Sequence, residues 1–240
     1  MQHYGLIGFP LEHSFSKRYF QQKFSSENIE ADYHNFPLES IEELMPLLAE
    51  HPLNGFNVTI PYKESVLEYL DEIDPEAEAI GAVNCVKITN GKRCGYNTDV
   101  HGFVSALLQC IEQRKPKALI LGTGGSSKAV ARGLEQLDIP YHFVSRRKKA
   151  EWFTYQEITP EVLHEYQLLI NTTPLGMWPS TTLPDLPYHE LGSQHVLFDL
   201  IYNPEETPFL SKGKEQGATI CNGLTMLHAQ AEKNWEIWQQ

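Results

Sequence analysis

Residues 55–65, GFNVTIPYKES, bring an amide, a hydroxyl and an amine close together in the sequence. Apolar and polar residues alternate from Phe56 to Ile60, a period of two that predicts a strand with Asn57 and Thr59 on one face. A proline ends the strand, and Lys63 follows at the expected start of a helix. An ammonium group can donate a proton and stabilise negative charge on oxygen. Taken alone, Lys63 is better explained as a surface residue.

Several other polar residues follow or precede predicted strands of the same region. They are Ser14, Ser16, Asn84, Asn97 and Asp99. Each also has a structural explanation, because a serine can cap the helix expected after it and Asp99 can cap the helix expected from Val100. Only in combination do these residues favour a binding site.

The composition argues against several classes of protein. The 240 residues are 41% hydrophobic, which is enough for a sizeable core, and the formal net charge is -12. An acidic chain binds a phosphate backbone poorly, so we expect no nucleic-acid partner. No apolar run reaches the length of a membrane span and no signal-peptide pattern is found. We therefore expect a cytoplasmic protein without a membrane partner.

The spacing of cysteines and histidines does not predict a metal site. Cys85, Cys94, Cys110 and Cys221 form no CxxC pair, and the ten histidines form no HxxxH pair. In a reducing cytoplasm, the four cysteines are expected to be free, buried thiols.

Strand and helix patterns alternate in two blocks, which predicts an α/β fold. In the first block, strands are expected at 4–8, 32–36 and 56–60, with helices at 16–26, 40–50 and from Lys63. Asn90-Gly91 predicts a β-hairpin with a type I′ turn, and a helix is expected at 100–113. The second block is expected to have strands at 117–121, 141–147, 167–174, 195–202 and 218–221.

A final helix at 223–240 has an apolar face and is expected to pack back on the first block. The prediction is therefore two α/β domains. Residues 1–100 plus 222–240 would form a mainly parallel sheet with its helices, and residues 101–221 a Rossmann-like dinucleotide-binding domain.

The segment GTGGSS lies between a predicted strand and a predicted helix, as a dinucleotide-binding loop does. Gly122 would allow the tight turn and Gly124 the close approach of a pyrophosphate. The backbone amides of Gly125, Ser126 and Ser127, at the start of the helix, would bind the negative charge of the pyrophosphate. Ser127 occupies the third position of the G-x-G-x-x-G pattern, so a purely structural turn is the alternative.

The segment VSRRKK follows the next predicted strand, where NAD-binding proteins commonly have an acidic residue for the ribose 2′-hydroxyl. Here Ser145, Arg146, Arg147 and Lys148 would suit a 2′-phosphate, because guanidinium groups bind phosphate in a matching geometry. A solvated basic cluster is the alternative. In so acidic a chain we favour the phosphate site, and we predict NADP(H) over NAD(H).

In combination, these motifs resemble the shikimate dehydrogenase family over nearly the whole chain. The matching motifs are H-S-x-S, N-V-T-x-P-x-K, G-A-V-N, N-T-D, G-x-G-G, D-x-x-Y at Asp199–Tyr202 and G-L-x-M-L-x-x-Q-A at Gly223–Ala231. The resemblance implies reversible, NADPH-dependent reduction of 3-dehydroshikimate to shikimate, on the route to chorismate and the aromatic amino acids. It assigns the first block and last helix to substrate and the middle block to the nucleotide.

The resemblance also implies roles for individual residues. Substrate carboxylate would be bound by Ser14 and Ser16, and substrate hydroxyls by Thr59, Asn84, Asp99 and Gln230. The catalytic pair would be Lys63 and Asp99. Tyr202 would lie near the carboxylate and the nicotinamide, and Gly223 and Met226 would line the cofactor cleft. Asn57 would either contact substrate or hold the loop in place.

The chain departs from the family pattern at a few positions. Lys17 and Phe20 stand where proline and histidine are common, and SRRK replaces N-R-T. The chain also stops soon after its last helix, and we expect a trimmed but competent enzyme, monomeric or homodimeric. The alternatives are a quinate/shikimate dehydrogenase with relaxed cofactor choice and a catalytically silent ligand sensor.

Overall fold

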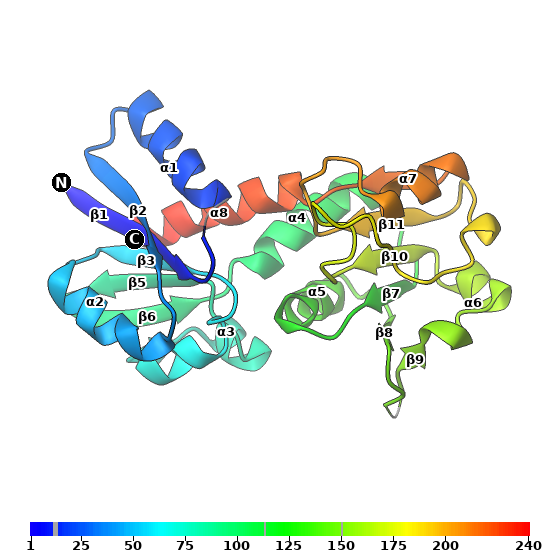
Figure 1. Cartoon of the computed structure of the whole chain (residues 1–240), viewed down its shortest axis with the longest axis horizontal. Helices are drawn as coiled ribbons and strands as arrows, with labels where there is room; N and C mark the ends of the chain where they lie inside the picture. Colours follow the sequence, from blue (N-terminus) through cyan, green and yellow to red (C-terminus); the bar gives the residue numbers. More distant parts are fainter. Residues whose placement is uncertain (12–13, 113, 150) are drawn as a thin grey trace. The chain divides into compact units, whose positions relative to one another are not determined.

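The structure, a computed structural model, describes residues 1–11, 14–112, 114–149 and 151–240 (Figure 1). The described chain forms two compact units, one of Met1–Thr98 with Ala231–Gln240 and one of Asp99–Gln230. The second boundary lies inside the last helix, whereas the sequence places it just before that helix. His13 of the H-S-x-S motif and Gln113, the expected end of a helix, lie outside the described residues.

The first unit is built on a six-stranded sheet in the order β2-β1-β3-β5-β6-β4. Its strands are β1 (Gln2–Gly8), β2 (Ala31–Pro37), β3 (Gly55–Val58), β4 (Glu72–Ile73), β5 (Cys85–Thr89) and β6 (Lys92–Tyr96). β1 is parallel to β2 and β3, and β4 to β6, whereas β5 is antiparallel to both of its neighbours. The carboxyl ends of β1, β3 and β6 therefore share one sheet edge with the amino end of β5.

Short helices connect these strands. They are α1 (Phe15–Ser26), α2 (Leu44–Glu50), α3 (Pro75–Ile80) and the 3-10 helices η1 (Ile41–Glu43) and η2 (Ser65–Tyr69). The helix predicted from Lys63 is only η2, because the Lys63 carbonyl accepts a hydrogen bond from the Val83 amide at 2.8 Å instead of from the next helical turn. The single helix predicted at 40–50 is η1 followed by α2.

The predicted hairpin is confirmed. Thr89 pairs with Lys92 across the turn, and Asn90 and Gly91 have φ values of 53° and 77°. Positive φ at both positions is what a type I′ turn requires. The turn reverses the chain so that β6 returns to the edge at which β3 ends.

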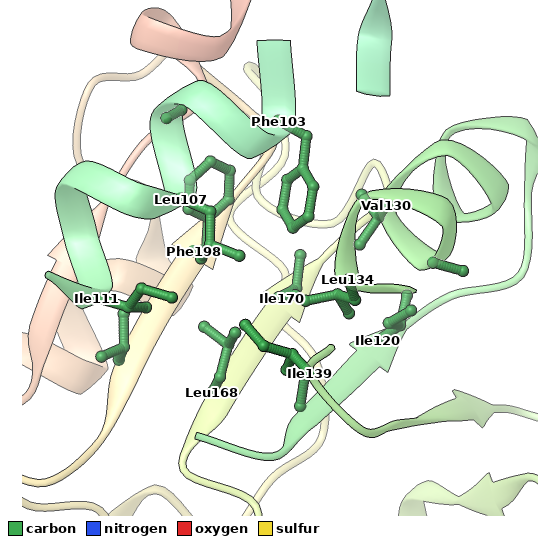
Figure 2. Close-up of a cluster of buried hydrophobic side chains, with 14 of the residues drawn as sticks. Phe103, Leu107, Ile111, Ile120, Val130, Leu134, Ile139, Leu168, Ile170 and Phe198 are labelled. Atoms are coloured by element: carbon green, nitrogen blue, oxygen red, sulfur yellow. The ribbon is translucent and has the colours of Figure 1, made fainter. Parts of the chain in front are cut away.

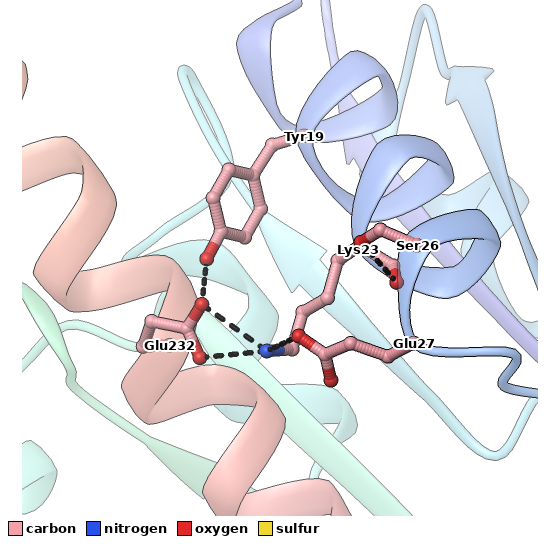
Figure 3. Close-up of polar contacts among 5 residues, drawn as sticks. All are labelled: Tyr19, Lys23, Ser26, Glu27 and Glu232. Carbon is pink, nitrogen blue, oxygen red and sulfur yellow. Dashed lines mark hydrogen bonds and ion pairs between the residues drawn. The ribbon is translucent and has the colours of Figure 1, made fainter.

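Aromatic packing fixes residues 231–239 of the last helix, α8 (Leu224–Gln239), within the first unit. Trp238 stacks on Tyr4 with 4.5 Å between ring centroids, and its indole N–H donates to the Val86 carbonyl at 3.0 Å. On the same helix, Glu232 accepts hydrogen bonds from Tyr19 and from Lys23 of α1 (Figure 3). Large buried rings of this kind contribute most of the apolar area in such a core.

The second unit has a six-stranded sheet in the order β12-β11-β10-β7-β8-β9, in which every pairing is parallel. Its strands are β7 (Ala118–Leu121), β8 (Tyr141–Ser145), β9 (Phe153–Thr154), β10 (Leu168–Asn171), β11 (Val196–Asp199) and β12 (Thr219–Cys221). Its helices are α4 (Asp99–Ile111), α5 (Gly125–Gln136), α6 (Pro160–Glu165), α7 (Pro208–Glu215), the start of α8, and the 3-10 helices η3 (Tyr155–Glu157) and η4 (Tyr188–Glu190).

One face of the second sheet packs on α4 and α5 (Figure 2). Phe103 of α4 meets Phe198 of β11 edge to face, with 5.4 Å between ring centroids. Gly133 of α5 allows the two helices to approach, because a Cβ there would lie 2.6 Å from the Phe103 ring. This parallel, helix-covered sheet confirms the predicted α/β fold class.

The prediction of four free cysteines is wrong for two of them. Cys110 of α4 and Cys221 of β12 form a disulfide, with 6.4 Å between their Cα atoms. The residues are 111 positions apart, and only the packing of α4 beside β12 brings them together. Cys85 and Cys94 are free, and burial raises the pKa of the Cys85 thiol.

Asp199, the first residue of the D-x-x-Y motif, supports the loop after β11. Its carboxylate accepts from Asn171 Nδ2 at 3.0 Å, the Ile201 amide at 3.0 Å and the Thr207 hydroxyl at 2.6 Å. Burial nevertheless raises the pKa of Asp199 to about 6, against the opposing effect of these hydrogen bonds. Asp199 therefore holds the chain on both sides of Tyr202. At a pH above its pKa, the buried carboxylate is ionised, and burial of that charge costs free energy.

We predict that Asp199 makes the free energy of unfolding decrease as pH rises through the mildly acidic range. Its pKa is higher in the folded chain than the ordinary value of 3.8, so the folded state binds more protons and loses stability as pH rises from about 4 to about 6. The full effect is about 3 kcal/mol. Urea unfolding of wild type and Asp199→Asn at several pH values isolates it as a difference. Parallel stability curves would contradict the assignment.

Candidate active site

The structure divides the predicted site residues between the two units. Ser14, Ser16, Thr59, Lys63 and Asn84 belong to the first unit. Asp99, Tyr202, Gln230 and all predicted cofactor residues belong to the second.

Thr59, Lys63 and Asn84 meet at the carboxyl end of β3. The Thr59 amide donates to the Ile7 carbonyl at 2.9 Å, which sets Thr59 beside the end of β1. The Lys63 carbonyl accepts from Val83, the residue before Asn84. Two segments, the loop after β3 that bears Thr59 and Lys63 and the residues before β5 that include Asn84, thus lie at one sheet edge, where parallel strands commonly present ligand-binding residues.

Asn57 has a supporting position. Its side chain is buried, with 4% exposed. Asn57 Oδ1 accepts from the Tyr33 hydroxyl at 2.8 Å, and Asn57 Nδ2 donates to the Asn84 carbonyl at 3.1 Å. Burial raises the pKa of Tyr33 well above its ordinary value, and a hydrogen bond with Ser16 acts against this. Asn57 therefore holds the chain at Asn84, and Tyr33 connects it to Ser16.

The two serines differ in their surroundings. Ser14 has the extended backbone of an N-cap residue before α1, yet its side chain makes no capping hydrogen bond. Its buried Oγ has no hydrogen-bond partner within the described residues. A buried hydroxyl without a partner costs free energy, so a ligand that satisfies it would be favoured. Capping alone does not explain Ser14.

Asp99 and Gln230 lie on helices that pack together in the second unit. Asp99 is the first residue of α4 and is 8% exposed. One turn later, Gly102 packs on α8, because a Cβ there would lie 2.6 Å from the Met226 carbonyl and 3.0 Å from Gln230 Cβ. Gln230 is 9% exposed and donates to the Leu227 carbonyl at 3.1 Å. Close helix packing at a glycine thus places Gln230 near the start of α4.

The glycine loop lies at the point where the strand order of the second sheet reverses, between β7 and β10. Gly122 has φ 109°, and a Cβ there would lie 2.7 Å from the Thr172 hydroxyl, so glycine is required. A Cβ on Gly124, the N-cap of α5, would meet no heavy atom within 4 Å among the described residues. This open space, next to the amides of Gly125 and Ser126 at the helix start, fits a pyrophosphate.

Ser127 replaces the third glycine of the fingerprint by bonding within the loop. Its hydroxyl donates to the Gly124 carbonyl at 2.6 Å, and the residue is 1% exposed. The serine therefore stabilises the turn that the fingerprint needs.

The basic segment after β8 is not a uniform cluster. Lys148 pairs with Glu157 at 2.7 Å, and Lys149 lies 4.3 Å from the Trp152 ring centroid. Lys148 helps to lower the pKa of Glu157 to about 2. Ser145 Oγ accepts from the Arg147 amide at 3.3 Å and shapes the turn. No carboxylate in the described part of the chain pairs with Arg146 or Arg147, so these two guanidinium groups suit a phosphate best.

Gly223 and Met226 follow β12, and Tyr202 follows β11, at the same edge of the second sheet. A Cβ on Gly223 would lie 2.1 Å from the Leu200 carbonyl oxygen, so the glycine permits this close backbone approach. The Met226 side chain is 8% exposed and packs in the hydrophobic core. Both residues thus have a structural role in addition to any contact with a cofactor.

Sequence reasoning missed three buried residues that support the site: Tyr33, Thr98 and Asn234. Asn234 directly precedes Trp235 on α8 and has 1% of its surface exposed. A polar residue on the apolar face of a helix was the available signal, because buried polar groups need a partner. The partner itself is not visible in the sequence.

Among the described residues, no group of histidine, cysteine, aspartate or glutamate side chains is able to hold a metal ion, and no helix is long and apolar enough to cross a membrane.

Comparisons with known proteins agree with the arrangement of both units. A family model for the shikimate dehydrogenase substrate binding domain matches residues 6–86. The shikimate dehydrogenase (NADP(+)) of Clostridium beijerinckii is 41% identical over 255 residues, covering 100% of this chain and 93% of that protein. The crystal structure of shikimate 5-dehydrogenase from Thermus thermophilus in complex with NADP(H) and shikimate has a TM-score of 0.88 at 31% identity. That match covers 99% of this chain and 93% of the other.

A further solved structure has related chemistry. Quinate dehydrogenase from Corynebacterium glutamicum in complex with NAD has a TM-score of 0.89 at 25% identity, covering 99% of this chain and 93% of the other. The two shikimate dehydrogenases named above are more similar in sequence to this chain, at 41% and 31% identity, over a similar share of its length. The chain therefore belongs to the shikimate dehydrogenase family.

Proposed function

We propose that this chain is an NADP-dependent shikimate dehydrogenase, which reversibly reduces 3-dehydroshikimate to shikimate in the biosynthesis of chorismate and the aromatic amino acids. The main supporting observation is the gathering of Thr59, Lys63 and Asn84 at one edge of the first sheet. Ser14 and Ser16 begin the helix that follows the neighbouring strand at the same edge. This set of groups matches a substrate with a carboxylate and several hydroxyls.

The substrate contacts follow from the chemistry of these side chains. Ser14 and Ser16 bind the carboxylate, and the unsatisfied Ser14 hydroxyl gains a hydrogen bond when it does so. Thr59, Asn84, Asp99 and Gln230 bind hydroxyl groups. Tyr202 lies near the carboxylate and the nicotinamide. The substrate domain comprises residues 1–100 with 222–240, and residues 101–221 bind the nucleotide.

Lys63 and Asp99 are the catalytic pair. When bound, the nicotinamide supplies or accepts the hydride. Lys63 donates a proton to the ketone oxygen during reduction and removes it from the hydroxyl during oxidation. Its positive charge also stabilises the negative charge that develops on that oxygen. Asp99 orients Lys63 and binds a substrate hydroxyl.

NADP(H) fits the described residues of the second unit. The open space at Gly124 and the amides of Gly125 and Ser126 hold the pyrophosphate. Ser145, Arg146 and Arg147 bind the 2′-phosphate, and Gly223 and Met226 lie near the nicotinamide. We also propose a cytoplasmic, monomeric or homodimeric enzyme.

The second candidate is a quinate/shikimate dehydrogenase with relaxed cofactor choice. It is favoured by the similarity to the quinate dehydrogenase fold. A catalytically silent sensor is disfavoured because both Lys63 and Asp99 are present.

The first test compares four reactions of the purified chain, with shikimate or quinate as substrate and NADP+ or NAD+ as cofactor. We expect fast NADPH formation from shikimate and slow turnover of quinate, followed by absorbance. Comparable rates with both substrates would establish the second candidate instead. Absence of shikimate turnover with either cofactor would refute the proposal.

Lys63→Ala should lose turnover much more than substrate affinity. General acid-base groups typically contribute about 10²- to 10⁴-fold, so we expect a fall of this size in kcat with a small change in KM. Steady-state kinetics with shikimate measure both, and Lys212→Ala on α7, whose ammonium pairs with Glu215, is the control. A normal kcat in Lys63→Ala would exclude a catalytic role.

Arg146→Ala should weaken the binding of NADP+ much more than the binding of NAD+. A charge-assisted hydrogen bond contributes about 1.5–3 kcal/mol, so we expect KM for NADP+ to rise about 10- to 100-fold. The matched control is Lys148→Ala. Because Lys148 is already paired with Glu157, its removal should raise KM for NADP+ less than Arg146→Ala does. Equal effects of Arg146→Ala on the two cofactors would argue against 2′-phosphate recognition.

A further inference from the structure

Thr98 holds both ends of the Asn84 side chain and is itself held by Asn234. The Thr98 amide donates to Asn84 Oδ1 at 2.8 Å, and Asn84 Nδ2 donates to Thr98 Oγ1 at 3.1 Å. The Thr98 hydroxyl donates to Asn234 Oδ1 at 2.6 Å. All three residues belong to the first unit, and none is more than 3% exposed.

We propose that Asn234 is a positioning residue, which orients the carboxamide of Asn84 toward a substrate hydroxyl through the hydroxyl group of Thr98. This inference rests on the function proposed above, in which Asn84 contacts substrate. Neither Thr98 nor Asn234 is assigned any contact with substrate or cofactor.

The orientation follows from the donors available. A backbone N–H can only donate, so the Asn84 atom beside it is the oxygen and the amide nitrogen lies at the other end. A threonine hydroxyl has one proton. Because Asn234 Oδ1 accepts that proton, Thr98 Oγ1 accepts from Asn84 Nδ2 and does not donate to Asn84 Oδ1, which lies 3.2 Å away. The Thr98 N–H thus fixes which end of the Asn84 amide is the nitrogen, and Asn234 keeps the Thr98 hydroxyl turned so that it accepts from that nitrogen.

The backbone of Asn84 is already fixed, so its side-chain rotation is the freedom that remains. The backbone N–H of Asn84 donates to the Tyr96 carbonyl at 3.1 Å, and the backbone carbonyl of Asn84 accepts from the Val58 N–H at 2.9 Å. Without Asn234 Oδ1, the Thr98 hydroxyl can turn toward Asn84 Oδ1, and Asn84 Nδ2 loses this acceptor. A carboxamide that must reorient when substrate binds stabilises the bound state and the transition state less than one that is already oriented.

Two pairs of variants test the proposal. Asn234→Leu removes the acceptor at similar volume, whereas Asn234→Asp keeps a side-chain oxygen. Thr98→Val removes the hydroxyl, whereas Thr98→Ser keeps it. We expect Asn234→Leu and Thr98→Val to lower kcat/KM for shikimate about tenfold while KM for NADP+ changes less than about twofold, and the other two variants to recover most of the loss.

A packing variant of the same helix separates positioning from stability. Ile237 is 5% exposed, so Ile237→Ala should lower Tm by loss of packing without changing kcat/KM for shikimate. If Asn234→Leu lowers Tm but leaves kcat/KM unchanged, Asn234 is only structural and the proposal fails. Failure of Asn234→Asp and Thr98→Ser to recover activity would also overturn it.

Two further outcomes are distinguishable. If Thr98→Val does not fold, the test is the increase in Tm that shikimate causes in Asn234→Leu and in Asn234→Asp. We expect a smaller increase for Asn234→Leu. Equal increases would overturn the proposal. If the wild-type chain does not turn over shikimate, the proposed function fails and this inference fails with it. An active wild type with unaffected variants refutes the positioning role alone.

Discussion

The hydrogen bonds to Asn84 hold together the polar edge of the first sheet. Its backbone bonds to β3 and β6, its carbonyl also accepts from Asn57, and its side chain bonds to Thr98. In a buried region each such group must be satisfied, and a network that satisfies all of them allows only one arrangement. Removing one partner would leave others unpaired. The segments bearing Thr59 and Lys63 depend on this arrangement, because the Lys63 carbonyl is bonded to the residue before Asn84.

The last helix, α8, contributes residues to both units. Its first part contributes Met226 and Gln230 to the second unit, and its second part contributes Asn234 to the first. Trp238 secures the second part, because its ring occupies the space that a side chain on Gly55 would need. Packing and polar contacts on one helix thus support residues of both units.

In the second unit, local pairing decides which cations remain for a ligand. Lys148 and Lys149 have partners on the following segment, Glu157 and Trp152. Such exposed pairs add little stability, but they keep those two side chains away from the turn. The arginines are left beside the end of β8, which is the position that nucleotide recognition requires.

The sequence by itself determined the fold class and most strand positions, because alternation, glycine turns and the Asn90-Gly91 hairpin are local signals. The order and combination of its motifs pointed to the family. The sequence also determined the types of residue at the polar edge of the first sheet. It did not predict the short η2 helix after Lys63 or the Cys110–Cys221 disulfide, since both depend on partners remote in the sequence. Only the tertiary structure decided which polar residues support others. Asn57, Thr98 and Asn234 are distant in sequence, and a hydrogen bond between buried side chains exists only once the strands and the last helix have packed.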